Sequence, residues 1–141
     1  MIFGRKRRVI TRLLVVEDEP LVAFDTEHLL TEEGYEVVAT VDRVADAVAA
    51  IERAEAIDLI LADVNLADGN GIDVARHAQA RGIAVLFVSS LCPADAAALA
   101  VGCLAKPYAQ RDLLAAVDAI DRTRQGKTPR ALPSGLRLFG G

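Results

Sequence analysis

The chain has 141 residues, the length of one domain, and 52% of them are hydrophobic, which is enough for a substantial core. Its 16 basic and 20 acidic residues give a formal net charge of -4, and aromatic residues make up only 4% of the chain, with no Trp. Nucleic acid is therefore not expected as the main partner. No apolar run approaches the roughly 20 residues that a membrane helix needs. Since Cys92 and Cys103 show no metal-binding spacing, we expect reduced thiols in a cytoplasmic protein without a membrane partner.

Residues 1–10 form a basic leader, for which a loosely ordered, solvated end is the default. The continuous apolar run at 13–16 has the length of a strand that is buried on both faces. A helix is expected to begin at Pro20, a residue that is favoured in the first helical turn. The next strand is predicted at 36–41, and Asp42 can cap the helix that follows it.

The third strand is predicted at 57–62 and is followed by turn residues at 68–71. After another helical pattern, the fourth strand is predicted at 83–88 and a short, weak fifth strand at 101–105. The apolar spacing across 113–120 predicts the final helix. Strands and helices therefore alternate along most of the chain.

This alternation indicates βαβ units with right-handed crossovers, and hence an α/β fold with a doubly wound parallel sheet. We predict the strand order 2-1-3-4-5 and place the domain at residues 11–124. Residues 125–141 are linker-like in composition and end with a few apolar side chains, so we expect a flexible C-terminal tail. No second domain is expected.

The residues with chemical potential all follow apolar runs, at the edge of the sheet where open α/β folds place their function. Glu17 and Asp18 follow the first run and Asp63 the third, and these two strands are neighbours in the predicted order. Three converging carboxylates repel one another and therefore favour a cation, and Mg²⁺ prefers oxygen ligands. A carboxylate that accepts a phosphoryl group needs such a cation together with a fixed positive charge. We therefore predict that Asp63 is a phosphoryl acceptor beside Mg²⁺, with Lys106 as the fixed charge.

Ser89 could donate a hydroxyl to the same phosphoryl oxygens. Its neighbour Ser90 is an alternative, because the alternation of side chains along a strand lets only one of the two face the site. The place of Ser89 at the end of the apolar run favours Ser89.

Together these motifs resemble the receiver domain of two-component response regulators, the CheY-like family, over about residues 12–124. Each motif alone is weak, but all four in this order at strand ends are specific. The matching residues are the pair Glu17-Asp18, Asp63, Ser89 and the pair Lys106-Pro107. The resemblance implies a flavodoxin-like (βα)5 fold.

The resemblance also implies a role for each matching position at the metal. The side chains of Asp18 and Asp63 would bind Mg²⁺, Glu17 would act largely through a bound water, and Asn65 would offer its backbone carbonyl. Asp63 would take its phosphoryl group from a phosphohistidine on a sensor histidine kinase.

Ser89 and Lys106 would hold the phosphoryl group, and a cis peptide bond would precede Pro107. In the family, the side chains at the positions of Asn65 and Leu91 flank the approach of the hydrolytic water and so tune the lifetime of the acyl phosphate.

The chain departs from the family pattern at Cys103, where receivers usually have Tyr or Phe. Without an aromatic ring, half of the family's conformational switch, which also involves Ser89 and Pro107, cannot work in the usual way. The segment between Ser89 and Lys106 is short, so the fourth helix is expected to be shortened. This form resembles receivers that work with HWE-type histidine kinases.

The predicted function is a single-domain response regulator that acts by protein–protein contact on a downstream target or as a phosphate sink. It would not be an enzyme beyond its own phosphorylation and dephosphorylation. One alternative is a pseudo-receiver that binds partners without phosphorylation, which Cys103 slightly favours. Another is a Mg²⁺-dependent phosphoryl-transfer enzyme of the Toprim or haloacid-dehalogenase type. Those classes need an Asp-x-Asp motif, whereas this chain has Asn65 after Asp63 and Glu17-Asp18-Glu19 at its first strand.

Overall fold

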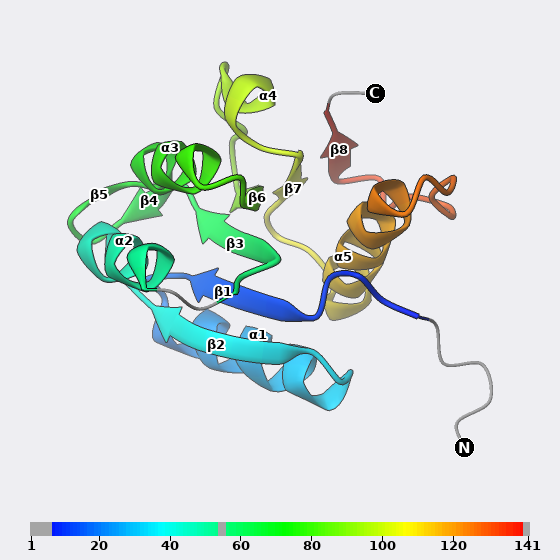
Figure 1. The fold of residues 1–141 in the computed structure, drawn as a ribbon, viewed down its shortest axis with the longest axis horizontal. Coiled ribbons are helices and arrows are strands. Elements are labelled where there is room, and N and C mark those ends of the chain that lie inside the picture. The colour runs from blue at the N-terminus through cyan, green and yellow to red at the C-terminus, as the bar shows by residue number, and fades with distance from the viewer. Residues whose placement is uncertain (1–6, 54–55, 140–141) are drawn as a thin grey trace.

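The computed structural model describes residues 7–53 and 56–139, and its centre is a six-stranded sheet in the order β2-β1-β3-β6-β7-β8 (Figure 1). The first five strands in this order are parallel, and the sixth is antiparallel. The strands are β1 Arg12–Val16, β2 Glu36–Val41, β3 Leu59–Asp63, β6 Ala84–Ser89, β7 Gly102–Ala105 and β8 Leu136–Leu138. The predicted doubly wound sheet of order 2-1-3-4-5 is confirmed, with β6 and β7 as its fourth and fifth strands.

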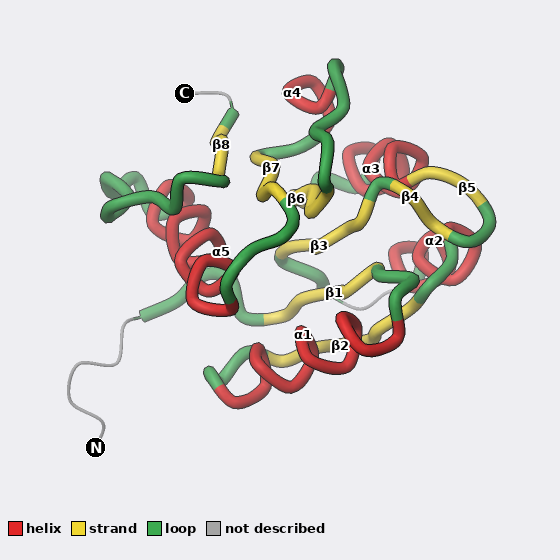
Figure 2. The backbone as a smooth tube through the Cα atoms, turned by 180° about the vertical axis from the view of Figure 1, so that it is seen from behind, coloured by secondary structure: helices red, strands yellow, loops and turns green. Residues whose placement is uncertain are grey.

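Helices cover both faces of this sheet (Figures 1 and 2). Residues of α1 and α5 pack with one face, and residues of α2, α3 and α4 pack with the other. The helices are α1 Pro20–Glu32, α2 Val44–Glu52, α3 Gly71–Ala80, α4 Ala96–Leu99 and α5 Gln110–Arg124. The fourth helix has only four residues, as its short sequence predicted.

The central strands are buried on both faces because their side chains alternate between the two helical layers. In β3, Leu59 and Leu61 pack with the α1 and α5 layer, whereas Ile60 and Ala62 pack with the α2 and α3 layer. All five residues of β3 are buried. This continuous burial explains why the strand appears in the sequence as an unbroken apolar run.

The start of α2 differs from the prediction that Asp42 caps it. Arg43 occupies the N-cap position, and its side chain makes no capping hydrogen bond. Instead, the backbone N–H groups of Val44 and Ala45 donate to the carboxylate of Asp68, at 2.6 and 3.1 Å. Asp68 belongs to the turn of a small hairpin, β4 Asn65–Leu66 with β5 Gly69–Asn70. The cap is thus supplied from a distant part of the chain, which local sequence patterns do not reveal.

The expectation of a flexible tail over 125–141 is wrong for the segment that forms β8. This strand pairs antiparallel with β7, with Leu136 opposite Leu104 and Leu138 opposite Gly102. The side chain of Leu136 is buried in the core layer that includes α1 and α5. The apolar residues at the end of the chain therefore cover a sheet edge that would otherwise be open.

The end of the basic leader is also ordered, in contrast to the expectation for 1–10. Ile10 is almost fully buried, and the backbone N–H groups of Val9 and Ile10 donate to Oδ2 of Asp121 at 3.0 and 2.9 Å. Gln125 donates to the other carboxylate oxygen of Asp121. Residues 1–6 of the predicted leader lie outside the described residues.

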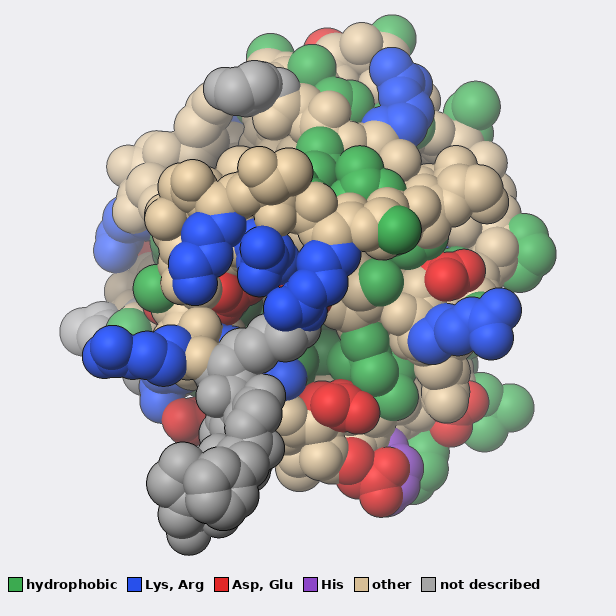
Figure 3. All heavy atoms as spheres, turned by 90° about the vertical axis from the view of Figure 1, so that its right-hand side faces the viewer, with side chains coloured by type: hydrophobic (Ala, Val, Ile, Leu, Met, Phe, Trp, Pro, Cys, Tyr) green, Lys and Arg blue, Asp and Glu red, His purple; other side chains and the backbone are tan. Residues whose placement is uncertain are grey.

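Basic side chains gather on the face formed around α5 and β8 (Figure 3), although the whole chain has a net charge of -4. The last turn of α5 contributes Arg122 and Arg124. Within 7–53 and 56–139, no helix is long and apolar enough to cross a membrane.

Candidate functional site

Three carboxylates meet at the carboxyl edge of the parallel sheet, as the sequence predicted. Glu17 and Asp18 directly follow β1, and Asp63 is the last residue of β3, which pairs with β1. One oxygen from each carboxylate lies within 4.8 Å of the others. Glu17 and Asp63 are buried, with 6% and 8% of their surface exposed, while Asp18 is more accessible. This arrangement offers an open side from which a cation or a phosphoryl donor can approach.

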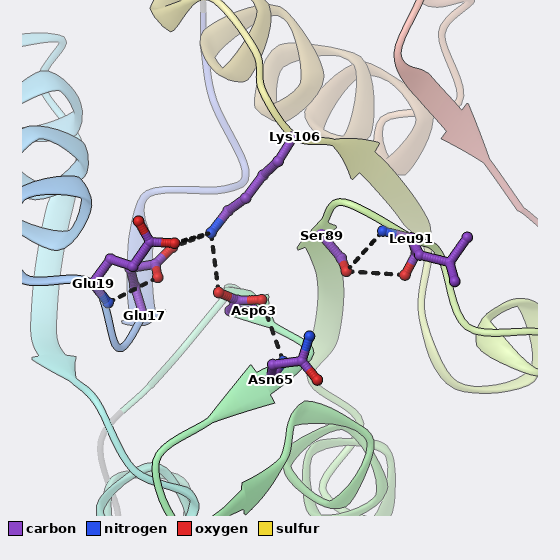
Figure 4. Close-up of polar contacts among 7 residues, drawn as sticks. All are labelled: Glu17, Glu19, Asp63, Asn65, Ser89, Leu91 and Lys106. Carbon is purple, nitrogen blue, oxygen red and sulfur yellow. Dashed lines mark hydrogen bonds and ion pairs between the residues drawn. The ribbon is translucent and has the colours of Figure 1, made fainter.

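Lys106, which directly follows β7, extends its side chain to this cluster (Figure 4). Its Nζ lies 2.8 Å from Oε1 of Glu17 and 3.0 Å from Oδ2 of Asp63. A third carboxylate, that of Glu19, lies 3.8 Å from the same nitrogen. The ammonium group therefore bridges the two buried carboxylates and offsets part of their mutual repulsion.

The protonation preferences of this group of residues follow from its burial and charge. Burial raises the pKa of Glu17 above its usual range, and its hydrogen bond with Lys106 only partly offsets this effect. Burial alone would lower the pKa of Lys106, but hydrogen bonds with Glu17 and Asp63 outweigh burial and raise that pKa above its usual range. Lys106 is thus held in its charged form, as a fixed positive charge beside a phosphoryl acceptor must be.

The hairpin after β3 fixes the backbone around Asp63. The N–H of Asn65 donates to Oδ1 of Asp63 at 3.3 Å, and the N–H of Gly71 donates to the carbonyl of Val64 at 2.6 Å. A Cβ atom at Gly71 would lie only 2.1 Å from the backbone oxygen of Asp63. Glycine is therefore required where α3 begins against the end of β3.

The structure places Ser89 at the end of β6, but its hydroxyl group is engaged locally. Ser89 Oγ donates to the carbonyl of Leu91 at 2.9 Å and accepts from the N–H of Leu91 at 3.2 Å (Figure 4). Ser90, not Ser89, is among the residues that line the cavity beside Asp63. The choice between the two serines therefore stays a prediction.

The remaining predicted positions lie on β7 and just after it. Cys103 is buried in β7, with its side chain in the α2 and α3 layer. The peptide bond between Lys106 and Pro107 is cis, as the resemblance implied. A cavity of about 690 Å³ lies beside Asp63, and Pro107 and Tyr108 are among the residues that line it. This cavity extends between α1 and the start of α5, and it leaves the acidic cluster accessible.

Comparison with known proteins identifies the family to which a chain with this site belongs. A model of the response regulator receiver domain matches residues 13–118. This chain belongs to the response regulator receiver domain family. The transcriptional regulatory protein PdtaR of Mycobacterium tuberculosis is 34% identical over 125 residues, which cover 81% of this chain and 58% of that protein. The chain thus spans somewhat more than half the length of this relative.

Solved receiver structures show the same fold. A CheY-like receiver protein from Methanospirillum hungatei superposes with a TM-score of 0.74 at 26% identity, covering 83% of this chain and 98% of that chain. The receiver domain of the sensor histidine kinase PA1611 from Pseudomonas aeruginosa has a TM-score of 0.67 at 25% identity, over 77% of this chain and 94% of that chain. That structure is described with a magnesium ion coordinated in its active-site cleft. As a receiver domain, the chain is assigned to two-component signalling, in which receivers interact with histidine kinases and downstream targets.

The donor set of this receiver fits the divalent cation that receivers generally bind. Glu17, Asp18 and Asp63 provide only oxygen ligands, two of them buried in a low-dielectric edge of the sheet. Hard oxygen donors of this kind suit Mg²⁺, which keeps several of its waters and needs open space for them. The cavity beside Asp63 provides that space.

Sequence reasoning missed several residues that shape the site. Glu19 approaches Lys106, Asp68 caps α2, and Gly71 allows α3 to begin against Asp63. The third acid in Glu17-Asp18-Glu19 was a visible signal for Glu19, and the Gly69-Asn70-Gly71 turn was one for Gly71. The contact of Asp68 with Val44 depends on tertiary structure and has no local signal.

Proposed function

We propose that this receiver is a Mg²⁺-dependent phosphoryl acceptor that is phosphorylated on Asp63 by a sensor histidine kinase. The observation that supports this most strongly is the bridging position of Lys106, at 2.8 Å from Glu17 and 3.0 Å from Asp63. A partly buried lysine between two buried carboxylates can neutralise the phosphoryl oxygens when one of these carboxylates becomes an acyl phosphate.

The chemistry follows from these positions. An oxygen of the Asp63 carboxylate attacks phosphorus in line while the bond from phosphorus to the donor's histidine nitrogen breaks. The phosphoryl group brings added negative charge, and Lys106 can turn from the Asp63 carboxylate to a phosphoryl oxygen by a small movement. Positioning and charge neutralisation supply most of the catalysis in such transfers.

Glu17, Asp18 and Asp63 would hold Mg²⁺, with the backbone carbonyl of Asn65 as a further ligand. The ion would supply the positive charge that lets one anion approach another. The receiver domain of PA1611, with its magnesium ion in the active-site cleft, supports this assignment by similarity.

We further propose that the protein acts by contact with a downstream target or as a phosphate sink, in the cytoplasm, with no enzymatic activity beyond its own phosphorylation and dephosphorylation. The short α4 supports the resemblance to receivers that work with HWE-type kinases. Phosphotransfer from an HWE-type kinase that outpaces transfer from other histidine kinases would support that pairing. Equal transfer rates would argue against it.

The test of phosphorylation uses acetyl phosphate as donor, with and without Mg²⁺, and intact mass as the readout. We expect the wild-type protein to gain one phosphoryl group only in Mg²⁺, and the Asp63→Asn variant to gain none. Asp25→Asn is the matched control, because Asp25 lines the same cavity but is exposed. If acetyl phosphate and a kinase both fail to label the wild-type protein, the pseudo-receiver interpretation replaces this proposal.

The two serines can be separated by the same assay. If Ser89 binds the phosphoryl group, its hydroxyl must exchange Leu91 for a phosphoryl oxygen, and Ser89→Ala should slow labelling by about tenfold, the value of one hydrogen bond to a charged group. Ser90→Ala should then label at nearly the wild-type rate. The reverse pattern would assign the role to Ser90, which already lines the cavity.

A further inference from the structure

The two cysteines of the chain lie together, beside the site but not in it. Cys103 is in β7, opposite Phe87 of the neighbouring strand β6. Cys92 is in the loop that leaves β6 after Ser89, and its side chain packs against the same apolar cluster that contains Cys103. The thiol of Cys92 lies near enough to Cys103 to help raise the pKa of the Cys103 thiol. Eleven residues apart in sequence, the two cysteines are therefore neighbours in the same apolar layer of the fold.

We propose that Cys92 and Cys103 form a reversible disulfide when the protein meets hydrogen peroxide, and that this bond ties the loop between β6 and α4 to β7. Disulfides in proteins that normally keep reduced thiols are usually transient and serve redox sensing or catalysis. Nothing in the acyl-phosphate chemistry proposed above requires either thiol. The pair thus provides a covalent modification site that is separate from Asp63.

The reaction balances with peroxide as the only oxidant. The thiol loses its proton, its sulfur attacks one peroxide oxygen, and the O–O bond breaks; a sulfenic acid forms, and the leaving hydroxide takes up the proton to become water. The second thiol then attacks the sulfenic sulfur, an S–S bond forms, and a second water leaves. Two thiols are oxidised and one peroxide is reduced.

The environments of the two thiols assign the order of these steps. Cys103 is only 3% exposed, and burial, together with the neighbouring Cys92 thiol, raises its pKa to about 12. Cys92 is only partly buried, so peroxide can reach it. Cys92 is therefore the residue that is oxidised first, and Cys103 is the one that resolves the sulfenic acid.

The loop can make the small movement that an S–S bond needs. Residues 90–95 form a loop without helix or strand. The hydrogen bonds between Ser89 and Leu91 hold the start of this loop, and the buried side chain of Ala96 holds its end. A disulfide needs the two Cβ atoms about 4 Å apart, the two Cα atoms about 4.4–6.8 Å apart and a dihedral angle near ±90° about the S–S bond. A rigid helix at Cys92 would resist this movement more than the irregular loop does.

A bond at this place would act on phosphorylation, and this part of the inference rests on the proposed function. Ser89, the last residue of β6, and Ser90, the first residue of the loop, are the candidates for the phosphoryl-binding hydroxyl, and only Leu91 separates them from Cys92. A loop fixed to β7 would restrict the movement of these hydroxyl groups toward Asp63. Oxidation should therefore slow phosphoryl transfer.

The first test measures the bond itself and is independent of phosphorylation. Wild-type protein is treated with hydrogen peroxide, free thiols are blocked with N-ethylmaleimide, and intact mass is recorded before and after dithiothreitol. We expect the loss of two hydrogen atoms, no maleimide adduct, and full reversal by dithiothreitol. In the Cys92→Ser variant, Cys103 should remain an unoxidised thiol after the same peroxide treatment. Sulfinic acid on Cys92, or disulfide-linked dimers with no internal bond, would overturn the proposal.

The second test compares acetyl phosphate labelling of reduced and oxidised protein. Reduced wild-type protein gives the reference labelling rate. If the proposed phosphorylation of Asp63 is wrong, this reduced protein is not labelled, and the mass test of the disulfide is unaffected. We expect slower labelling of the oxidised wild-type protein, recovery after dithiothreitol, and no effect of peroxide on Cys92→Ser. If the disulfide forms and the two labelling rates are equal, the bond has no regulatory effect on the acceptor.

Discussion

Lys106 balances the charges of the site at the scale of single residues. It is the cation that contacts both buried carboxylates, Glu17 and Asp63, among the described residues. A buried ion pair adds little net stability by itself, but removing one partner leaves an uncompensated buried charge. Lys106 therefore has a structural role before phosphorylation and a chemical role during it.

Replacing Lys106 with Met should make the protein more dependent on Mg²⁺ for stability. In Mg²⁺-free buffer, we expect the free energy of unfolding to fall by about 1–3 kcal/mol, because two buried carboxylates lose their charged hydrogen-bond donor. Mg²⁺ should then stabilise the variant more than the wild type, since the ion offsets the same repulsion. Urea denaturation with and without Mg²⁺ measures this difference, with exposed Lys127→Met as control. An equal effect of Mg²⁺ on wild type and variant would contradict the role of Lys106.

The hydrogen bonds of Asp58 lead to a second prediction at the scale of single residues, which concerns how the stability of the protein depends on pH. Burial alone would raise its pKa, but hydrogen bonds from Thr11 and Arg12 outweigh burial and lower that pKa below its usual 3.8. A carboxyl whose pKa is lowered by folding stabilises the folded state above its unfolded pKa, and this contribution disappears as pH falls through the folded pKa.

Asp58→Ala should therefore destabilise the protein by about 1–2 kcal/mol at pH 7, the value of lost hydrogen bonds to a charged group on the surface. The difference from wild type should shrink as pH falls below 3.8, the usual value for this group. Urea denaturation across pH 2 to 7 checks this, and Asp42→Ala, at an exposed acid, is the control. A difference that stays constant with pH would contradict the linkage.

At the scale of elements, the site depends on how closely α3 approaches the end of β3. Gly71 is the first residue of α3, and its position for a Cβ is occupied by the backbone of Asp63. Backbone cannot move aside as a flexible side chain can. Any larger residue here must push α3 away from the strand that presents Asp63.

Gly71→Ala should therefore destabilise the protein by about 1–3 kcal/mol, a typical cost of overpacking, and should also slow labelling of Asp63. Gly69→Ala, in the hairpin strand β5 just before α3, is the matched control, because its Cβ would meet only the Val44 side chain, at 3.2 Å. Urea midpoints and acetyl phosphate labelling measure the two effects. Wild-type behaviour of Gly71→Ala would show that the backbone contact with Asp63 does not matter.

The added edge strand β8 gives a second prediction at the scale of elements. Leu136 is buried where β8 covers β7, whereas Leu132 is 45% exposed. Leu136→Ala should cost about 2–3 kcal/mol, at the lower end of the range for buried leucines, since the site lies at the sheet edge. Leu132→Ala should change stability by less than about 0.5 kcal/mol. If both changes have the same small effect on the urea midpoint, β8 does not contribute to the stability of the fold.

At the scale of the whole molecule, sequence patterns predicted the parallel sheet and the place of the site. Buried strands such as β3 appear as continuous apolar runs, and their carboxyl ends necessarily meet at one edge. The predicted topology of the sheet was therefore sufficient to place Glu17, Asp63 and Lys106 close together. The resemblance to receivers added the roles of Asn65 and the cis bond before Pro107.

Sequence patterns failed where a contact joins distant segments of weak local pattern. The strand β8 has only three residues, and its pairing with β7 is visible only in the folded chain. The backbone of Val9 and Ile10 is held in place by the carboxylate of Asp121, which is more than 100 residues away in the sequence. Side-chain alternation could not choose between Ser89 and Ser90, because the strand ends there and the loop geometry decides which hydroxyl faces the site.

The central claim is that Asp63 accepts the phosphoryl group in the presence of Mg²⁺, and chemical mapping tests it most directly. Protein labelled with acetyl phosphate is reduced with borohydride, which converts an aspartyl phosphate to homoserine, and the peptides are sequenced by mass spectrometry. We predict homoserine at position 63 alone, and none when Mg²⁺ is removed. Homoserine at another acidic residue, or at position 63 without Mg²⁺, would contradict this account of the site.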